Sequence, residues 1–335
     1  MPEAALLTVT DLTKHFPVRR SMGELLQGQR RTVRAVDGVS FSIRKGEIFG
    51  LIGESGCGKT TTGKLVMKLI EPTGGSLSFM GQSATHLGGQ ALARYRTCVQ
   101  MIFQDPYASM NPRFKIRDVL EEPLLIHHVG ARRSERDERI RQALEAVKLT
   151  PVEDIMGRFP HMLSGGQRQR AATARTLILS PALLVADEPV SMIDLSTRAE
   201  ILAMMKGLQR DLGLTFLYIT HDLSTARYFT DRIAVMYLGR IVEIGSPDEV
   251  VDHPVHPYTR ALIAAVCEPV SGRVGQIKHL PIKGEIPSAA SIPHGCRFHP
   301  RCIYAAPECQ TLPEPELTEI APGHQAACRR WKEIG

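Results

Sequence analysis

The chain has 335 residues and a formal net charge of +6, with 43% hydrophobic and 23% charged residues. This length and composition are typical of a globular protein with two domains, or with one large domain and an appendage. No apolar run approaches the roughly 18 residues of a membrane-spanning helix, and the N-terminal segment lacks the regions of a secretory signal, so we expect an intracellular protein.

The first elements lead into a glycine-rich loop. Strands are expected at residues 5–16, 35–43 and 48–52. A basic loop at residues 17–34 separates the first two strands; we expect it to be solvated, and it carries no motif that predicts a nucleic-acid partner. The third strand runs directly into GESGCGKT at residues 53–60, and a helix should follow from about residue 59 to 70. This order of strand, glycine loop and helix is the context that a phosphate-binding loop requires.

The middle of the chain is expected to be largely helical, from residue 91 to residue 180, and to form a helical subdomain. Strands are then expected at residues 182–186 and 214–219, with an amphipathic helix at 197–212 between them. Alternating strands and helices predict an α/β fold with a largely parallel sheet. After residue 245 the chain becomes rich in Pro, Gly and His, so we expect one domain at residues 1–245 and a second at 246–335.

The glycine-rich loop carries the residue types that bind a nucleotide triphosphate. Its backbone N–H groups can approach phosphate oxygens closely because no Cβ intervenes, and the helix N-terminus behind them adds partial positive charge. Lys59 should reach the β- and γ-phosphates, Thr60 should supply a hydroxyl to Mg²⁺, and Thr61 should bind near the α-phosphate. The expected ATP-binding residues of this loop are Gly53, Glu54, Ser55, Gly56, Cys57, Gly58, Lys59, Thr60 and Thr61. For Cys57 itself we expect a small packing residue.

Four polar residues after apolar runs are the catalytic candidates. Asp187 should hold Mg²⁺ through its water shell, and Glu188 should polarise the attacking water, since phosphoryl transfer depends on positioning and charge stabilisation. Gln104 is expected to contact Mg²⁺ or the attacking water, and His221 the γ-phosphate. Alone, a Gln before a turn or a His after a strand is more often structural; their order among the other motifs favours the catalytic interpretation.

These motifs together resemble the nucleotide-binding subunit of an ABC transporter, a P-loop NTPase, over about residues 5–245. In that family's order they are the Walker A motif at 53–60, the Q-loop at Gln104, the signature LSGGQRQR at 163–170, the Walker B motif at 183–188, the D-loop at 191–194 and the switch histidine His221. The resemblance implies an ABC cassette with a helical subdomain, and it implies that Phe16 stacks on adenine.

The resemblance also implies a head-to-tail dimer, in which the signature of one subunit completes the ATP site of the other. The residues that would do so are Ser164, Gly165, Gly166 and Gln167. A hydroxyl, unobstructed N–H groups and a helix N-terminus are all suited to a γ-phosphate, so ATP would hold two subunits together and hydrolysis would release them. In the D-loop, Ser191 and Asp194 keep the family's residues although the two between them do not, and we expect function to survive.

The last part of the chain is similar to the C-terminal extension of oligopeptide and dipeptide importer ATPases. The similar segments are residues 256–262, 284–287 and 295–302. This resemblance implies an ATPase that powers peptide import from the cytoplasmic face of the plasma membrane, together with a second homologous ATPase, two membrane permeases and an extracytoplasmic solute-binding protein. Residues 107–125 should dock a cytoplasmic helix of the permease. The alternatives are an importer of oligosaccharides or other solutes, a soluble ABC ATPase without a transport role, and a degenerate module that binds ATP without turnover.

Four of the seven cysteines lie close together near the end of the chain, with spacing C-x5-C-x6-C-x18-C. They are Cys296, Cys302, Cys309 and Cys328. In an intracellular protein such a cluster indicates metal more often than disulfides, and the spacing lacks the close pairs of common zinc modules. Because some peptide-importer ATPases hold a 4Fe–4S cluster in this extension, the resemblance implies one here, with zinc or free thiols as alternatives and a structural role in each case.

Overall fold

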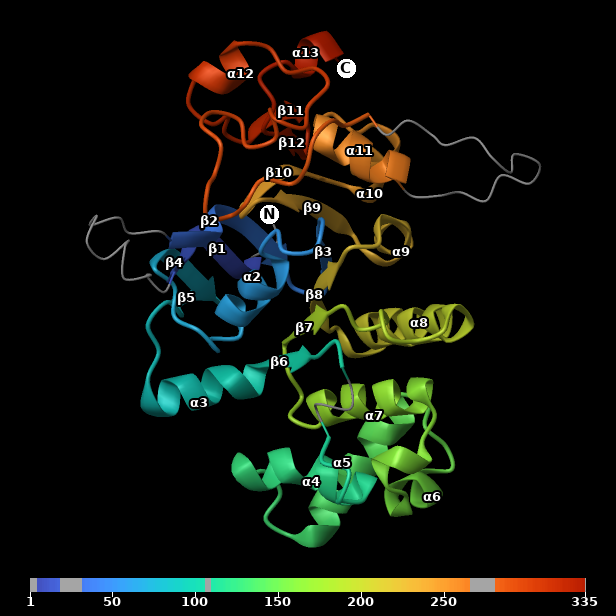
Figure 1. Ribbon diagram of the computed structural model, residues 1–335. Helices are drawn as coiled ribbons and strands as arrows, with labels where there is room; N and C mark the ends of the chain where they lie inside the picture. Colours follow the sequence, from blue (N-terminus) through green and yellow to red (C-terminus); the bar gives the residue numbers. More distant parts are fainter. Residues whose placement is uncertain (1–4, 19–31, 106–109, 266–280, 335) are drawn as a thin grey trace, which may run out of the picture.

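A computed structural model describes residues 5–18, 32–105, 110–265 and 281–334 (Figure 1). Most of the basic loop expected at 17–34 lies outside these residues. The first sheet has four antiparallel strands in the order β2-β1-β4-β5. Its strands are β1 (Ala5–Pro17), β2 (Thr32–Arg44), β4 (Gly74–Phe79) and β5 (Gln82–Ser83). The two strands expected at 5–16 and 35–43 are confirmed, and β4 and β5 were not expected from the sequence.

The second sheet is the centre of the molecule and has eight strands in the order β11-β12-β10-β9-β3-β8-β7-β6. These are β3 (Ile48–Ile52), β6 (Val99–Ile102), β7 (Leu183–Asp187), β8 (Thr215–Thr220), β9 (Arg232–Tyr237), β10 (Arg240–Gly245), β11 (Thr318–Ala321) and β12 (His324–Ala326). The run β9-β3-β8-β7-β6 is parallel, as the alternating pattern predicts. Every residue of β3, β7 and β8 is buried, which is why these strands read as continuous apolar runs.

The parallel strands fix the place of the polar candidates. In a parallel sheet the carboxyl ends of all strands lie along one edge, and ligands bind in the crevice outside that edge. The phosphate loop follows β3, Glu188 follows β7, His221 follows β8, and Gln104 comes two residues after β6. These four segments, distant in sequence, therefore start from neighbouring positions on the same edge.

Apart from the helices of the C-terminal part, the helices fall into two groups. Around the sheets lie α2 (Lys59–Val66), α3 (Gly89–Cys98), α8 (Leu195–Leu212) and α9 (Leu223–Phe229). A separate helical lobe contains α4 (Ile116–Ile126), α5 (Arg133–Ala146), α6 (Val152–Gly157), the short 3-10 helix η1 (Pro160–Met162) and α7 (Gly165–Leu177). The range expected for the helical subdomain, 91–180, also takes in β6, which pairs with β7 in the central sheet. The helix expected at 59–70 ends earlier, at Val66.

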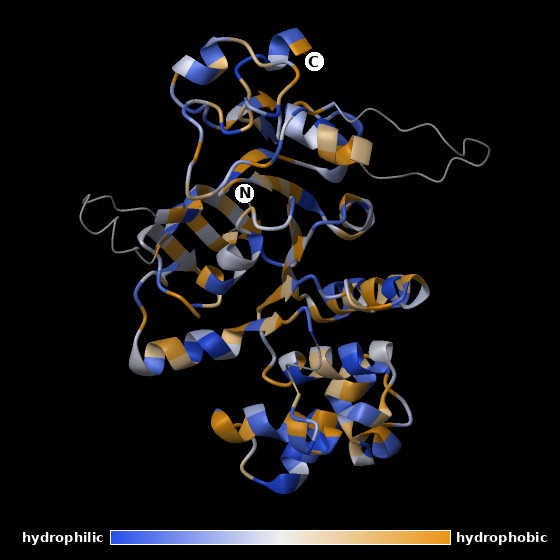
Figure 2. Cartoon of the chain, in the orientation of Figure 1, coloured by the Kyte–Doolittle hydropathy of each residue, from blue (hydrophilic) through white to orange (hydrophobic). Residues whose placement is uncertain are grey.

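The hydropathy pattern distinguishes the central strands from the helices of the lobe. Figure 2 shows hydrophobic residues along the central strands, whereas the helices of the lobe carry hydrophilic residues among their hydrophobic ones. In α5 the buried residues are Ile140, Ala143 and Leu144, one face of a helix whose other positions are mostly charged. No helix among the described residues is both long and apolar enough to cross a membrane.

The C-terminal part lies at the end of the molecule opposite the helical lobe (Figure 1). It consists of α10 (Pro247–Asp252), α11 (Pro257–Ala265), α12 (Glu308–Thr311), α13 (Trp331–Ile334) and the strands β11 and β12. Because β12 pairs with β10, this part extends the central sheet. A shared aromatic core joins it to β9: the ring of Tyr237 lies 4.6 Å from that of Tyr258 and 5.3 Å from that of Phe298, centre to centre. The division expected after residue 245 stays a prediction.

Candidate nucleotide site

A cavity of about 570 Å³ brings the phosphate loop and the catalytic candidates together. Its lining residues are Ala35, Gly53, Glu54, Ser55, Gly56, Gly58, Lys59, Thr60, Thr61, Gln104, Glu188, His221 and Leu262. Of the loop residues expected to bind ATP, only Cys57 does not line this cavity. Its side chain is buried, and burial raises the pKa of its thiol. The buried position agrees with the expectation that Cys57 is a small packing residue.

The loop has its shape because two positions admit no side chain. A Cβ on Gly53 would lie 2.2 Å from the carbonyl oxygen of Met236, and one on Gly58 would lie 2.1 Å from that of Ala35. Gly58 also has a φ of 114° and precedes α2 without any side-chain cap on the helix. The first N–H groups of α2 therefore meet no capping side chain and can serve an anion.

Lys59 and Thr60 are held in place by the loop and by β7. The buried Lys59 Nζ donates to the carbonyl oxygens of Gly53, at 2.7 Å, and Glu54, at 2.9 Å. Thr60 Oγ1 donates to Asp187 Oδ1 at 3.2 Å. Burial raises the pKa of Asp187 and outweighs the opposing effect of this hydrogen bond. A divalent cation at the Thr60–Asp187 pair would favour the ionised carboxylate, so the two oxygens suit the predicted Mg²⁺.

Two of the other catalytic candidates, Gln104 and His221, contact Glu188. Its Oε2 accepts a hydrogen bond from Gln104 Nε2 at 3.1 Å, and its Oε1 lies 3.0 Å from His221 Nδ1. Its backbone has a φ of 46°, unusual for a residue with a side chain, and its N–H donates to the Ile219 carbonyl at 2.9 Å. The strained turn directs the carboxylate away from β7 and toward the loops that follow β6 and β8.

The other predicted residues lie outside this cavity. Ser164 begins α7 in the helical lobe, where its Oγ accepts from the Gln167 N–H at 3.2 Å and its N–H donates to Gln167 Oε1 at 3.0 Å. Ser164, Gly165 and Gln167 line none of the cavity, nor does the buried Gly166, which packs against Thr197. The role predicted for these residues, in the nucleotide site of a second subunit, stays a prediction.

Phe16 and the D-loop residues lie near the site without lining it. The Phe16 ring is 38% exposed, with Lys14 Nζ 5.3 Å from its centre. Ser191 Oγ donates to the Glu188 carbonyl at 3.0 Å. Asp194 is the N-cap of α8, and hydrogen bonds from Ser196 and Thr197 lower the pKa of its carboxyl to about 2. The roles predicted for these residues stay predictions.

Two lining residues were missed by sequence reasoning. Ala35 belongs to β2 and Leu262 to α11, so the first sheet and the C-terminal part each provide a wall of the cavity. Neither is a chemically distinctive residue, and neither lies near a nucleotide motif in sequence. Only the packing of α11 beside β9 brings Leu262 to the phosphate loop.

The predicted metal cluster is not supported. All four cysteines, Cys296, Cys302, Cys309 and Cys328, line one small cavity of about 20 Å³. Burial raises the pKa of Cys296 to about 12 and that of Cys328 to about 11. Within the described ranges no three His, Cys, Asp or Glu side chains are placed so that they could hold a metal ion. The placement of the four cysteines therefore fits neither a 4Fe–4S cluster nor a zinc site.

Comparisons with known proteins show which families and relatives this chain is similar to. The ABC transporter family matches residues 36–191, and the family described as Oligopeptide/dipeptide transporter, C-terminal region, matches residues 242–309. The oligopeptide transport ATP-binding protein AppF of Bacillus subtilis is 45% identical over 98% of this chain and 98% of its own. The dipeptide transport ATP-binding protein DppF of Escherichia coli is 42% identical over 96% of this chain and 93% of its own.

Solved structures agree on the cassette fold. The dimeric ATP-binding cassette MJ0796, in a post-hydrolysis state bound to ADP and Pi, superimposes with a TM-score of 0.62 at 27% identity. It covers 72% of this chain and 98% of its own. The cassette cbiO1 of Clostridium perfringens has a TM-score of 0.63 at 24% identity and supports the fold alone.

Proposed function

The chain belongs to the ABC transporter ATP-binding proteins of the oligopeptide/dipeptide type, and on that premise we propose that it hydrolyses ATP to power peptide import across the plasma membrane. The observation that carries the proposal is the contact of Glu188 with both Gln104 and His221 in the cavity of the phosphate loop. A structural role would not need three polar side chains to converge where a terminal phosphate would lie. A module that only binds ATP would not need them either.

Most of the residues that line the cavity, together with Asp187 and Phe16 outside it, have a proposed role in hydrolysis. The phosphate loop and Lys59 bind the phosphates, and Thr60, Gln104 and Asp187 hold Mg²⁺, which neutralises developing charge on the phosphates. Glu188 accepts a proton from the attacking water as its general base. His221 orients the Glu188 carboxylate and contacts the γ-phosphate, and Phe16 stacks on the adenine.

The proposed working unit is a dimer. Ser164 and its neighbours begin a helix outside this chain's own cavity, where a second subunit could present its nucleotide to them. The capping box of Ser164 and Gln167 fixes the geometry of that helix start. The dimeric state of MJ0796 supports the arrangement by homology. In this proposal Ser191 and Asp194 form the D-loop contact between the two subunits.

Membrane partners complete the proposal. The second ATPase would be a homologous subunit, and two permeases and an extracytoplasmic binding protein would provide the path and the solute; this chain would lie at the cytoplasmic face. The proposed docking segment is residues 107–125, in which Phe114 and Leu125 are exposed apolar side chains, 50% and 52% exposed. Residues 107–109 of the expected docking range 107–125 lie outside the described residues.

The test is transport by the assembled complex in vesicles. Wild-type complex with its binding protein should couple ATP hydrolysis to uptake of labelled peptides, and an otherwise identical complex with Lys59→Met should do neither. Uptake of labelled oligosaccharides in place of peptides would select the oligosaccharide alternative. ATP hydrolysis by a purified chain that copurifies with no permease would favour a soluble ATPase.

The role of the four cysteines is proposed to be structural, tying together the turns of the C-terminal part. Their chemistry is decided by one measurement on protein purified without oxygen. Iron and acid-labile sulfide in equal amounts would restore the 4Fe–4S cluster, and zinc alone would select that metal. Protein free of both would leave free thiols, which is consistent with the absence of a metal-binding group among the described residues.

A further inference from the structure

The phosphate loop is held from outside by the C-terminal part of the chain. Arg301 donates two hydrogen bonds to the Glu54 carboxylate, from Nη1 at 2.8 Å and from Nη2 at 3.0 Å. The Glu54 N–H donates to the hydroxyl of Tyr258, on α11, at 2.9 Å. Glu54 belongs to the loop that lines the nucleotide cavity, whereas both partners lie more than 200 residues further along the chain.

The Arg301 guanidinium has little freedom to leave this position. The residue is 5% exposed, and its guanidinium carbon lies 5.9 Å from the ring centres of both Tyr237 and Phe298. A planar guanidinium that binds a carboxylate through two parallel hydrogen bonds fixes the orientation of its partner as well as the distance. The aromatic core under the C-terminal part therefore determines where the Glu54 side chain lies.

Glu54 in turn connects to the lysine of the site. The Glu54 carbonyl accepts one of the hydrogen bonds of Lys59 Nζ. The side chain, N–H and carbonyl of Glu54 are thus all hydrogen-bonded, and the partners of the side chain and of the N–H belong to the C-terminal part. Because phosphate binding depends on the direction of the loop's N–H groups, fixing this residue fixes a part of the phosphate cradle.

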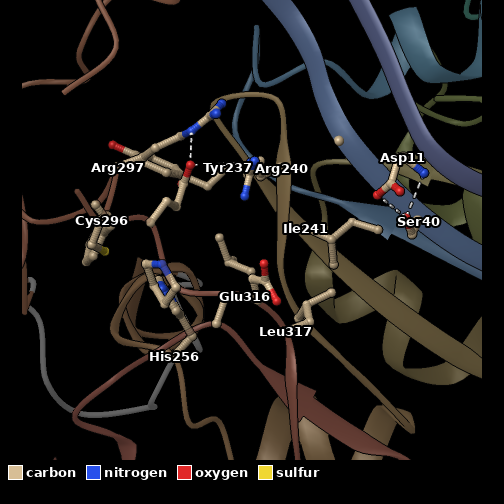
Figure 3. A pocket seen from close by; sticks show the side chains of 16 residues that line it. Asp11, Ser40, Tyr237, Arg240, Ile241, His256, Cys296, Arg297, Glu316 and Leu317 are labelled. Carbon is tan, nitrogen blue, oxygen red and sulfur yellow. Dashed lines mark hydrogen bonds and ion pairs between the residues drawn. The ribbon is translucent and has the colours of Figure 1, made fainter. Parts of the chain in front are cut away.

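The segment Cys296–Cys302 makes a second contact on the other side of the site. Arg297 pairs with Asp37 of β2, and Asp37 Oδ1 lies 2.8 Å from His15 Nε2, next to Phe16. Figure 3 shows Cys296 and Arg297 at the wall of a separate cavity between β1, β2, β9, β10 and the C-terminal part. One short segment with a cysteine at each end therefore contacts both the phosphate loop and β2, whose Asp37 pairs with His15 of β1.

We propose that Arg301 is a positioning residue for ATP: it holds the phosphate loop, through Glu54, in the conformation that binds the nucleotide. The C-terminal part is then a component of the nucleotide site and not an independent appendage. This inference rests on the proposed ATP site, and it adds to that proposal a role for a segment outside the cassette motifs. Arg301 does not line the nucleotide cavity, and in this proposal it acts only through Glu54.

The experiment is a double-mutant cycle read by MgATP binding to the purified full chain. Arg301→Met should weaken binding roughly tenfold, which corresponds to about 1.4 kcal/mol of binding free energy. Glu54→Gln should weaken it similarly. If Arg301 acts through Glu54, the double variant should bind about as weakly as the weaker single variant, and additive losses would overturn the proposal.

Two further variants separate positioning from general loosening. Arg330→Met is the matched control, because Arg330 also lies in the C-terminal part and pairs with Glu333, away from the loop; its affinity for MgATP should equal that of the wild type. Tyr258→Phe removes only the hydroxyl that accepts from Glu54 and keeps the buried ring, so it should fold and should also bind MgATP more weakly.

The outcomes distinguish this inference from the proposed function. Wild-type protein that fails to bind MgATP would refute the ATP site itself. Wild-type protein that binds, together with Arg301→Met and Tyr258→Phe proteins that bind equally well, would refute only the positioning role. In the assembled complex, Arg301→Met should raise the KM for ATP while kcat at saturating ATP stays near the wild-type value, because Glu188 and His221 are unchanged.

Discussion

Replacement of Glu188 by Gln tests the proposed base directly. Glutamine keeps the length of the side chain and one acceptor oxygen, so the contact with Gln104 Nε2, now 3.1 Å from Oε2, can persist. What disappears is the negative charge that accepts the proton from water. A positioned general base contributes about 10²–10⁴-fold, which corresponds to roughly 3–5 kcal/mol of activation free energy.

The assay is steady-state phosphate release by the assembled complex at saturating MgATP, with nucleotide binding measured in parallel. The Glu188→Gln complex should release phosphate at least about 100-fold more slowly while it still binds ATP, and it should accumulate as a closed, ATP-bound dimer. Glu153→Gln is the control, because Glu153 is an exposed glutamate on α6 whose charge pairs with Arg141, outside the nucleotide motifs. An unchanged rate in the Glu188→Gln complex would show that another group takes the proton.

Three other changes have defined outcomes. Lys59→Met should lower the affinity for MgATP by roughly 30-fold or more, since a hydrogen bond to a charged group is worth about 1.5–3 kcal/mol, and nucleotide titration measures it. The buried His256 accepts from the Tyr258 N–H, and burial lowers its pKa to about 4 from 6.5, although the facing Glu243 opposes the shift. Below pH 6.5 the unfolded chain takes up a proton that the folded one does not, so the free energy of unfolding should fall by about 2 kcal/mol between pH 7 and 5; His256→Asn should remove that fall in urea titrations at the two pH values. Ser164→Ala should leave ATP binding to the isolated chain intact but slow hydrolysis by the complex, and its lost helix cap should cost about 1 kcal/mol in thermal unfolding; equal hydrolysis would place Ser164 outside the partner's site.

The sequence by itself determined the local chemistry. The glycine loop, Lys59 and the acids after β7 follow from short-range rules, because the conformation of a tight turn and the end of a buried strand are encoded by neighbouring residues. Continuous apolar runs predicted β3, β7 and β8 nearly to their ends, since strands buried on both faces contain few polar residues. The strands β9 and β10 were not expected, although they too are almost wholly buried.

Only the tertiary structure decided which distant groups meet. The convergence of Gln104 and His221 on Glu188 requires β6, β7 and β8 to be neighbours, a fact of sheet order that no local pattern contains. The pairing of Arg301 with Glu54 depends on β12 joining β10 and on an aromatic core shared between two parts of the chain. The four cysteines are a further example. They lie close together in the sequence and line one cavity, but ligation of a metal depends on the directions of their side chains, which packing sets.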